Sequence, residues 1–511
     1  MEALVSSDTK SNIRIAKNSL YMTIRMLAVL CITFYSTRVI LNSLGVVDYG
    51  VYNVVAGFVS LFSFLGTSMS NAIQRFYNYE FARNGIRGAQ NVFNTSVIIQ
   101  IFLAVVLISL LELTGPWYIQ NKMVITESTQ DNAQYLFQFS VLSFVCVILQ
   151  SPFLAAVMAH ERMGFYSIVS VIDAGLKLLI AFLLSYFTKQ PLLIYGLFLF
   201  IEHLLILFLY IIYTVKIFEE IKFTFSFDKS LMKAMLSFSG WNVFGTFSGV
   251  MKDQGVNMIM NLFFGPVVNA AKGVASQINN GIQSFVSNII IPARPHLVQS
   301  YSLGNIDRVM QLTYTVSKYS TFILYMIALP LISEIDYILK LWLGTNIPEY
   351  SATFVRIVIF IAFINNLNGS ISGVVHASGK MKSYQILGAV VNILAVPIVY
   401  VSLRLGGTPY LAMILVGCVT FLNQIVCMIV LKSIVPYSIK DYLSSVICPF
   451  CLVVITTIWI PYVIMFCMNP SFGRLCTILF SCIVAISISA YFLGISSRER
   501  ENLKKLISRY I

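Results

Sequence analysis

The stretch from Lys252 to Ser287 reads KDQGVNMIMNLFFGPVVNAAKGVASQINNGIQSFVS and sets polar residues into an apolar background. It opens on Lys252 and Asp253, then turns at Phe264-Gly265-Pro266. The polar residues that follow are spaced three and four apart, which places them on one face of a helix: Asn269, Lys272, Ser276, Asn279, Asn280, Gln283 and Ser287. The apolar neighbours indicate a membrane, where lipid cannot satisfy polar groups, so this stripe must line a cavity or another helix.

A similar polar stripe lies 220 residues earlier in the chain. Its members have the same helical spacing: Asn53, Ser60, Ser63, Thr67, Ser70 and Gln74. With a shift of 220 residues, Ser60 falls on Asn280, Ser63 on Gln283, Thr67 on Ser287 and Gly45 on Gly265. The repeat shows in polarity and spacing more than in identity. It predicts two lobes with a shared polar cavity.

The composition is that of a polytopic membrane protein. Of 511 residues, 58% are hydrophobic and 11% are charged, and the mean hydropathy is +0.82. Soluble domains are roughly 45–50% apolar and about 25% charged. The nine cysteines lie almost wholly within apolar runs, which excludes a disulfide framework. The net charge of +13 reflects the excess of Lys and Arg that sets membrane topology rather than nucleic-acid binding.

Apolar runs of about 20 residues, each long enough to cross roughly 30 Å of hydrocarbon, recur along the chain. We predict fourteen spans: 20–44, 51–73, 92–112, 134–159, 165–188, 192–215, 235–264, 267–291, 311–333, 352–376, 384–404, 409–432, 444–467 and 473–495. The predicted parts are a polar N-terminal segment (1–19), an N-lobe (20–220), a C-lobe (235–432), two extra helices (444–495) and a basic amphipathic tail (496–511). The two six-helix lobes form a parallel pseudo-repeat.

The distribution of basic residues predicts that both termini are cytoplasmic. In this scheme 22 of the 34 Lys and Arg residues lie on the cytoplasmic side and 5 on the outer side, which supports an even number of spans. No cleavage site follows the first apolar run, so we expect an uncleaved first helix. In the tail, Ser496 stands three residues before Glu499, the spacing of a capping box that starts an interfacial helix.

Charged residues inside the spans are candidate functional groups, because burying a charge in lipid is costly. They are Arg25, Arg38, Asp173, Lys177, Glu202, Lys252, Asp253, Lys272, Lys318 and Arg356, with His203 and His376 beside them. Basic residues outnumber acidic ones seven to three, which favours an anionic substrate such as a phosphate. The alternatives are that Arg25, Lys318 and Arg356 snorkel from span ends and that Asp173 pairs with Lys177.

Three carboxylates are candidates for coupling to a proton or a sodium ion. They are Asp253, Glu202 and Asp173, although Asp253 could equally form a permanent ion pair with Lys252. No cofactor or metal site is expected. The pair Cys448 and Cys451 lies in an apolar span and predicts packing, and the segment from Gly373 to Lys380 lacks the spacing of a phosphate-binding loop. The pairs Gly245/Gly249 and Gly369/Gly373 predict close helix contacts or hinges.

Four segments of the N-terminal region form a characteristic set: Asn18-Ser19-Leu20-Tyr21, Ser36 to Gly45, Asp48 to Val55 and Gln74-Arg75-Phe76. With these segments the region resembles the Wzx-type polysaccharide flippases of the multidrug/oligosaccharidyl-lipid/polysaccharide (MOP) exporter superfamily. The resemblance covers the first 90 residues, and the fourteen-span plan fits the whole chain. It implies a bacterial inner-membrane carrier that turns undecaprenyl-diphosphate-linked sugars from the cytoplasmic to the outer leaflet. It also implies that Arg25, Arg38, Arg75 and Lys252 contact the diphosphate.

We therefore expect a non-enzymatic flippase for surface polysaccharide, such as O-antigen or capsule, that works by alternating access. Lys252, Lys272 and Arg38 would hold the diphosphate, and the two stripes, with Asn280 and Gln283, would bind sugar hydroxyls. Expected partners are the lipid-linked oligosaccharide, membrane lipids, H⁺ or Na⁺ as the coupling ion and the polysaccharide polymerase machinery, with no nucleic acid. The rival interpretations are a multidrug cation exporter, which needs an acidic cavity, and a polymerase or glycosyltransferase, which needs a large outer loop. A structural scaffold would have no need of charges in mid-membrane.

Overall fold

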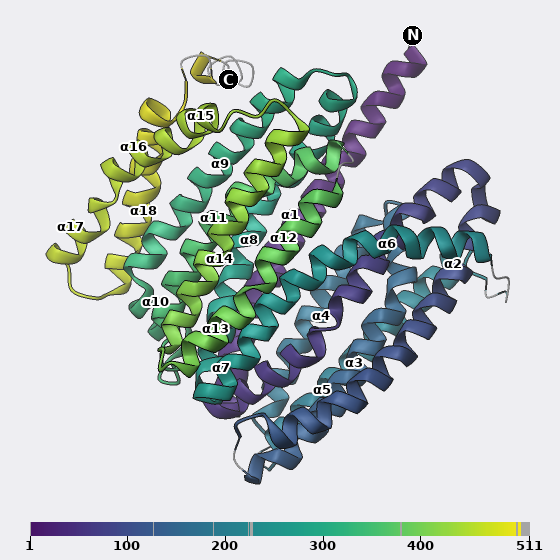
Figure 1. Ribbon diagram of the computed structural model, residues 1–511, viewed down its shortest axis with the longest axis horizontal. Coiled ribbons are helices and arrows are strands. Elements are labelled where there is room, and N and C mark those ends of the chain that lie inside the picture. The colour runs from purple at the N-terminus through teal and green to yellow at the C-terminus, as the bar shows by residue number, and fades with distance from the viewer. Residues whose placement is uncertain are drawn as a thin grey trace. The chain divides into compact units, whose positions relative to one another are not determined.

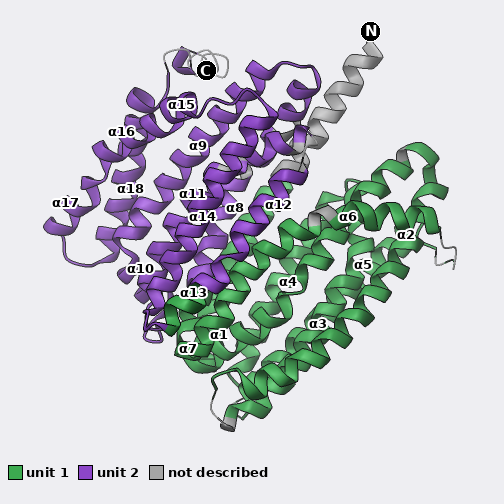
Figure 2. Cartoon of the chain, in the orientation of Figure 1, with its two compact units in different colours: residues 1–273, 399–404 green, residues 274–398, 405–511 purple. Residues whose placement is uncertain are grey.

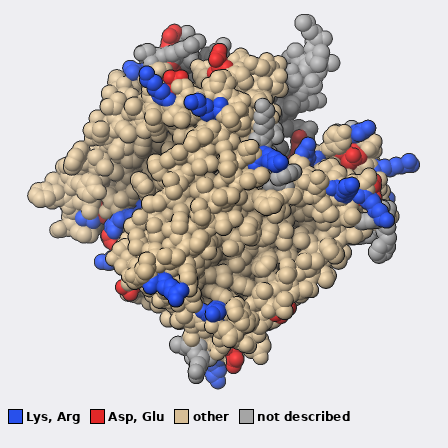
Figure 3. Space-filling view, viewed as in Figure 1, with Lys and Arg blue, Asp and Glu red and all other residues tan. Residues whose placement is uncertain are grey.

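A computed structural model describes residues 2–125, 127–187, 189–222, 224, 228–378, 381–496 and 499–501, with side chains from residue 21 onward. The described residues form helices and no strands (Figure 1). Eleven helices within them are long and apolar enough to cross a membrane. The chain is thus an all-helical polytopic membrane protein, as the composition predicts. On the face shown in Figure 3, charged side chains gather towards the ends of the helices and the surface between carries few.

The first part of the chain contains nine helical elements. They are α1 (Glu2–Ser60), α2 (Ser63–Asn121), α3 (Glu127–Ala159), α4 (Met163–Leu184), α5 (Pro191–Ile217), α6 (Lys229–Val250), the π-helix η1 (Met251–Gly255), α7 (Val256–Phe264) and α8 (Pro266–Ser302). Asp228 caps the start of α6 by accepting hydrogen bonds from the amides of Ser230 and Leu231. The connection between α2 and α3 is residues 122–126 only.

The second part contains twelve more elements. They are α9 (Ile306–Ser333), α10 (Ile335–Leu343), α11 (Ser351–Ser378), α12 (Met381–Ile393), α13 (Ala395–Arg404), α14 (Pro409–Ile434), α15 (Ile439–Tyr442), η2 (Leu443–Ile447), α16 (Cys448–Thr457), α17 (Trp459–Cys467), α18 (Phe472–Ser489) and η3 (Ala490–Gly494). Arg474 of α18 donates a hydrogen bond of 2.8 Å to Glu334 at the end of α9. Both side chains are buried, so this ion pair fastens the C-terminal helices to α9.

The chain divides into two compact units (Figure 2). Residues 1–273 and 399–404 form the first unit, and residues 274–398 and 405–511 form the second. The division falls inside α8 and not between α5 and α6, so α6, η1 and α7 belong to the first unit. The lobe boundaries 20–220 and 235–432 stay a prediction.

Glycines with positive φ break the long helices at equivalent places in the two halves. Gly45 inside α1 has φ 76° and ψ 170°, and Gly265 between α7 and α8 has φ 74° and ψ −172°. This part of backbone space is nearly exclusive to glycine. Gly85 inside α2 (φ 58°) and Gly304 before α9 (φ 72°) mark a second pair of breaks, 219 residues apart. The backbone therefore carries the same period as the polar stripes.

The eleven apolar helices are fewer than the fourteen predicted spans. One reason is that α1 and α2, which Gly45 and Gly85 interrupt, each count only once among the eleven. The segment from Lys229 to Ser302, which holds α6 to α8, does not count among the eleven. It carries the polar stripe, which lowers its hydropathy. The number fourteen stays a prediction.

Candidate functional site

The π-helical turn η1 interrupts a long apolar helix at the point where that helix carries charged residues. It joins α6 to α7 and contains Lys252, Asp253 and Gln254. The Lys252 side chain is half-buried, and that of Asp253 is exposed. A π-turn adds one residue to the helical turn and disturbs the regular hydrogen-bond ladder, and such turns are frequent at functional sites.

Lys272 on α8 reaches back to this turn. Its Nζ donates a hydrogen bond of 2.5 Å to the backbone carbonyl of Asp253. Among the described residues, no carboxylate oxygen lies within ion-pair distance of the Lys272 ammonium. The structure thus brings together Lys252, Asp253 and Lys272, three residues that the sequence marked. The hydrogen bond of the Lys272 ammonium goes to a neutral carbonyl, and the Asp253 carboxylate acts on its charge from beyond ion-pair distance.

A cluster of asparagines lies on the other side of this turn and joins α1, α7 and α8. Asn269 donates to the backbone carbonyl (2.7 Å) and the side-chain oxygen (2.9 Å) of Asn257. Asn261 donates to Asn269 (3.1 Å), and Asn257 donates to the carbonyl of Asn53 (3.2 Å). The amide of Val124 donates to the Asn261 side chain. We call these four asparagines the amide cluster.

The amide cluster shows which of the two expected surroundings, a cavity or another helix, this end of the polar stripe has. Asn257, Asn261 and Asn269 are almost fully buried, and their polar atoms bind one another. At this end the stripe contacts a neighbouring helix, and it does not line a cavity. Asn257 and Asn261 escaped the sequence argument because they lie on α7, before the stripe begins. The signal that could have found them is their spacing of four residues in an apolar run.

Glycines allow these helices to approach closely. A Cβ atom on Gly50 would lie 1.9 Å from the carbonyl oxygen of Pro266. Because this oxygen belongs to the backbone, it cannot move aside as a flexible side chain could. A Cβ atom on Gly273 would lie 2.6 Å from the Asn53 side chain, and one on Gly57 would lie 2.6 Å from Gln254. The first unit therefore holds the start of α8 and the π-turn η1 directly against α1.

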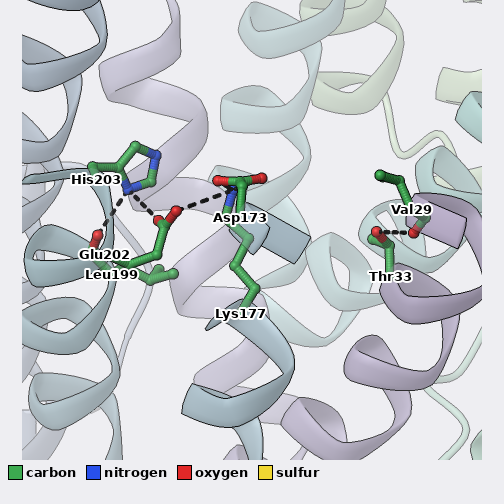
Figure 4. A network of polar contacts seen from close by, with 7 residues as sticks. All are labelled: Val29, Thr33, Asp173, Lys177, Leu199, Glu202 and His203. Atoms are coloured by element: carbon green, nitrogen blue, oxygen red, sulfur yellow. Dashed lines mark hydrogen bonds and ion pairs between the residues drawn. The ribbon is translucent and has the colours of Figure 1, made fainter. Parts of the chain in front are cut away.

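A second group of charges lies between α4 and α5 (Figure 4). Lys177 donates to both oxygens of Asp173, at 2.8 and 3.0 Å, and its Nζ lies 4.0 Å from Glu202. His203 Nδ1 lies 2.8 Å from Glu202 and 2.7 Å from the carbonyl of Leu199. We call Asp173, Lys177, Glu202 and His203 the charge quartet. The expected pair of Asp173 with Lys177 is present, but it is one part of a larger network.

The three arginines expected to bind diphosphate lie at separate places in the first unit. Arg25 and Arg38 are both half-buried on α1, thirteen residues or about 20 Å apart. Arg25 stacks over the ring of Tyr166, 5.0 Å from its centroid, and the exposed Arg75 stacks over Phe238 at 4.3 Å. A role of these arginines in binding diphosphate stays a prediction.

The remaining stripe residues continue along α8. Asn280 is exposed and Gln283 is half-buried, two and three turns after Lys272. On the earlier stripe, the hydroxyls of Ser60 and Thr67 donate to carbonyls of their own helices. A role of these residues in binding sugars stays a prediction.

Two buried networks were missed by the sequence argument. Tyr77 of α2 donates to Glu220 at 2.6 Å, and His160 Nε2 lies 2.5 Å from the same carboxylate oxygen. In the second unit, Lys318 donates to Glu499 at 2.7 Å and does not snorkel to the surface. Both networks join residues more than 50 positions apart, so no local pattern could reveal them.

The capping box predicted for the tail is present. The Ser496 amide donates to the Glu499 carboxylate at 2.7 Å, and the Glu499 amide donates to the Ser496 hydroxyl at 3.4 Å. Residues 502–511, the rest of the predicted interfacial helix, lie outside the described residues, as does the side chain of His376. Arg356 forms an exposed ion pair with Asp336 at 2.7 Å.

The structure describes several of the motifs that the sequence argument weighed. Cys448 and Cys451 are free cysteines. Within the described residues, no group of three His, Cys, Asp or Glu side chains could hold a metal ion. A Cβ atom on Gly369 would lie 2.6 Å from Ile290, which confirms a close helix contact, whereas Gly249 has open space around it. Gly379 and Lys380, the end of the imperfect phosphate-loop pattern, are outside the described residues.

Solved structures of MOP transporters have the same fold as this chain. The lipid II flippase MurJ in an inward closed conformation superposes with a TM-score of 0.67 at 15% identity, covering 92% of this chain and 98% of MurJ. An inward-facing multidrug resistance MATE family transporter superposes with a TM-score of 0.61 at 13% identity, covering 81% and 94%. A MOP superfamily transporter from Pyrococcus furiosus, described as having a binding pocket of reverse polarity, gives 0.57 at 13% identity, covering 82% and 95%. No protein-family profile and no curated protein sequence matches the chain.

Proposed function

We propose that the protein is a carrier that flips an undecaprenyl-diphosphate-linked oligosaccharide from the cytoplasmic to the outer leaflet of the bacterial inner membrane. The observation that carries this proposal is the ammonium of Lys272, which is held at the π-turn by a neutral carbonyl and has no carboxylate partner among the described residues. In an apolar protein, a cation whose hydrogen bond goes to a neutral carbonyl favours an anionic ligand. Lys252 stands on the same turn, so Lys252, Asp253 and Lys272 together carry a formal charge of +1.

The comparison structures support a flippase over other carriers of the fold. The alignment with the lipid II flippase covers 92% of this chain, whereas the MATE transporter covers 81%. The larger share of this chain that the lipid II flippase covers agrees with the prediction of two helices, at 444–495, beyond the twelve of the two lobes. The resemblance of residues 18–76 to Wzx-type flippases adds the oligosaccharide to the proposed substrate. The product would serve surface polysaccharide synthesis, together with the polymerase machinery.

In the proposed mechanism the two lobes alternate between access from the cytoplasm and access from outside. Lys252, Lys272, Arg25, Arg38 and Arg75 are the candidates for the diphosphate. A diphosphate that leaves the membrane surface loses its water and counter-ions, and the positive charges of these side chains would compensate for that loss. Asn280 and Gln283 are candidates for the sugar hydroxyls, and Asp173, Glu202 and Asp253 are candidates for coupling to H⁺ or Na⁺.

Transport of a fluorescent undecaprenyl-diphosphate oligosaccharide in proteoliposomes tests this function. We expect the wild-type protein and the Lys189→Gln variant, which changes an exposed lysine outside the candidate site, to flip the lipid alike. Lys272→Gln and Lys252→Gln should each slow flipping at least tenfold, because a phosphate contact with a charged donor contributes about 1.5–3 kcal/mol. Equal rates in all four proteins would contradict the cationic grip.

The alternative is an exporter of cationic drugs. It is favoured by the MATE transporters among the structures of the same fold and by the two carboxylates of the charge quartet. In the same proteoliposomes this function would move a cationic dye and leave the lipid in place. A polymerase or glycosyltransferase is disfavoured by the short connection at residues 122–126.

A further inference from the structure

The carboxyl group of Glu202 is buried without a directed hydrogen bond. The residue is 2% exposed, and neither side-chain oxygen accepts a hydrogen bond of good geometry from any described residue. His203 Nδ1 lies 2.8 Å away, but its N–H is directed at the Leu199 carbonyl. Lys177 lies 4.0 Å away and gives its hydrogen bonds to Asp173. Native proteins rarely leave a buried polar group unsatisfied, and an exception calls for an explanation.

The ammonium of Lys177 occupies the place where a metal cation would bind. It contacts both oxygens of Asp173 and lies within ion-pair distance of Glu202, so it stands between the two carboxylates (Figure 4). A hard metal cation needs several oxygen ligands at once. The Leu199 carbonyl, which could be another ligand, accepts the bond from His203. The quartet therefore carries its own cation.

The charges of the quartet balance when one proton is added. Two carboxylates and one ammonium sum to −1, and one proton, on the Glu202 carboxyl group or on the His203 ring, brings the sum to zero. The other titratable groups that interact with Glu202 are Tyr52 on α1, Cys146 on α3 and Tyr195 on α5. A phenol and a thiol are ordinarily neutral at physiological pH. Among the described residues, Lys177 and His203 are the basic side chains that interact with Glu202, so the balancing proton belongs to this group.

We propose that Glu202 binds one proton in each transport cycle and that Lys177 makes the site specific for protons over sodium. The carboxylate takes the proton from water on one side of the membrane, becomes a neutral carboxylic acid, and returns the proton to water on the other side. No bond other than O–H forms or breaks. The inference rests on the proposed carrier function, since the cycle is that of the carrier, and it names the coupling ion and the residue that holds it.

Infrared difference spectroscopy of the purified full chain, without lipid substrate, tests the proton site. As the pH is lowered, we expect the carbonyl band of a protonated carboxyl group to appear. Glu202→Gln should lose this band, and Glu112→Gln, which changes an exposed glutamate on α2, should keep it. Replacing sodium by choline should leave the band unchanged. A band that persists in Glu202→Gln, or that sodium suppresses in the wild type, would overturn the proposal.

Lys177→Gln keeps the proposal testable if Glu202→Gln does not fold. Removing the ammonium vacates the cation position between two carboxylates, so sodium should now suppress the band in Lys177→Gln, where choline does not. Indifference of this variant to sodium would refute the role of Lys177. Because these measurements use no lipid substrate, their outcome is separate from that of the flipping assay: a carrier of another substrate would still show the proton site.

Discussion

At the scale of single residues, Glu220 is a buried carboxylate whose partners come from two other elements. It lies in the connection between α5 and α6, where Tyr77 donates to it and His160 lies against it. The His160 ring stacks on Phe218 with centroids 4.1 Å apart. Burial acts to raise the pKa of Glu220, but the hydrogen bonds from Tyr77 and His160 outweigh it and hold the pKa below the ordinary value of 4.5. The ionised form therefore stabilises the fold.

The sign of the pH dependence follows from this direction. A carboxyl group with a lowered pKa contributes its full stability above its pKa in the unfolded chain and loses it as the pH falls through its pKa in the folded protein. We expect the melting temperature in detergent to fall between pH 5 and pH 3, and to fall less in Glu220→Gln. A steeper fall in Glu220→Gln than in the wild type would contradict the assignment.

Tyr77→Phe removes one donor from the same carboxylate. We expect a loss of about 1–3 kcal/mol in the free energy of unfolding, because the buried acceptor keeps its charge and loses a partner. Tyr79→Phe is the matched control, since Tyr79 lies two residues along α2 and is 55% exposed. Thermal unfolding followed by intrinsic fluorescence would measure both variants, and equal melting temperatures would show that the Tyr77 bond contributes nothing.

Residues of this kind also mark the limit of sequence reasoning. The positions of Lys252, Asp253 and Lys272 on facing helices could be predicted, because charges in an apolar run are conspicuous and the turn at Gly265 folds one segment onto the next. The role of Glu220 could not be predicted, since its hydrogen bonds come from Tyr77, 143 positions away, and from His160 in another turn. Polar residues in connections carry no periodicity that reports a distant partner.

At the scale of elements, the glycine breaks test whether the repeat is structural. Gly45 and Gly265 have nearly the same φ and ψ, in a region that costs other residues of the order of 1–3 kcal/mol. No atom would lie within 4 Å of a Cβ on Gly45, and the one atom near Gly265 would be at an ordinary contact distance, so backbone strain dominates at both sites. Gly45→Ala and Gly265→Ala should therefore destabilise the protein by similar amounts.

Gly240→Ala is the control for these two variants. It lies inside α6 with open space around it and an ordinary helical conformation, so alanine should raise stability by roughly 0.5–1 kcal/mol. Melting temperatures of the three variants, in the same detergent, decide the question. A neutral Gly45→Ala beside a destabilised Gly265→Ala would mean that the two breaks are not equivalent.

The helices themselves were easier to foresee than their ends. The apolar runs and the 220-residue period predicted the all-helical class and the correspondence of Gly45 with Gly265. The sequence argument ended the first helix near residue 44 correctly, yet it missed that η1 is a π-turn. A π-turn differs from an α-turn by one added residue, and hydropathy does not distinguish them.

At the scale of the whole molecule, Glu499 ties the start of the C-terminal tail to α9. Its Oε2 accepts from Lys318 at 2.7 Å and from the Ser496 amide at 2.7 Å. The Lys318 side chain is 8% exposed. We expect Glu499→Gln to cost about 3–5 kcal/mol, because it leaves a buried ammonium without its partner.

The double variant Lys318→Met with Glu499→Gln should be more stable than Glu499→Gln alone, since no buried charge is left over. Thermal unfolding of the wild type, both single variants and the double variant forms a complete cycle. Additive losses would show that the two side chains do not interact, and the tail would then be held by other contacts.

The amide cluster has a consequence for how the molecule responds to its surroundings. Its four asparagines join α1, α7 and α8 through neutral donors and acceptors only. Neutral groups do not titrate, are hardly screened by salt and do no work against a voltage across the membrane. The contact that holds these helices together is therefore indifferent to the electrochemical gradient, whereas the charge quartet is exposed to it. Under the proposed proton coupling, the charge quartet would sense the energy source, and the neutral amides would hold the helices.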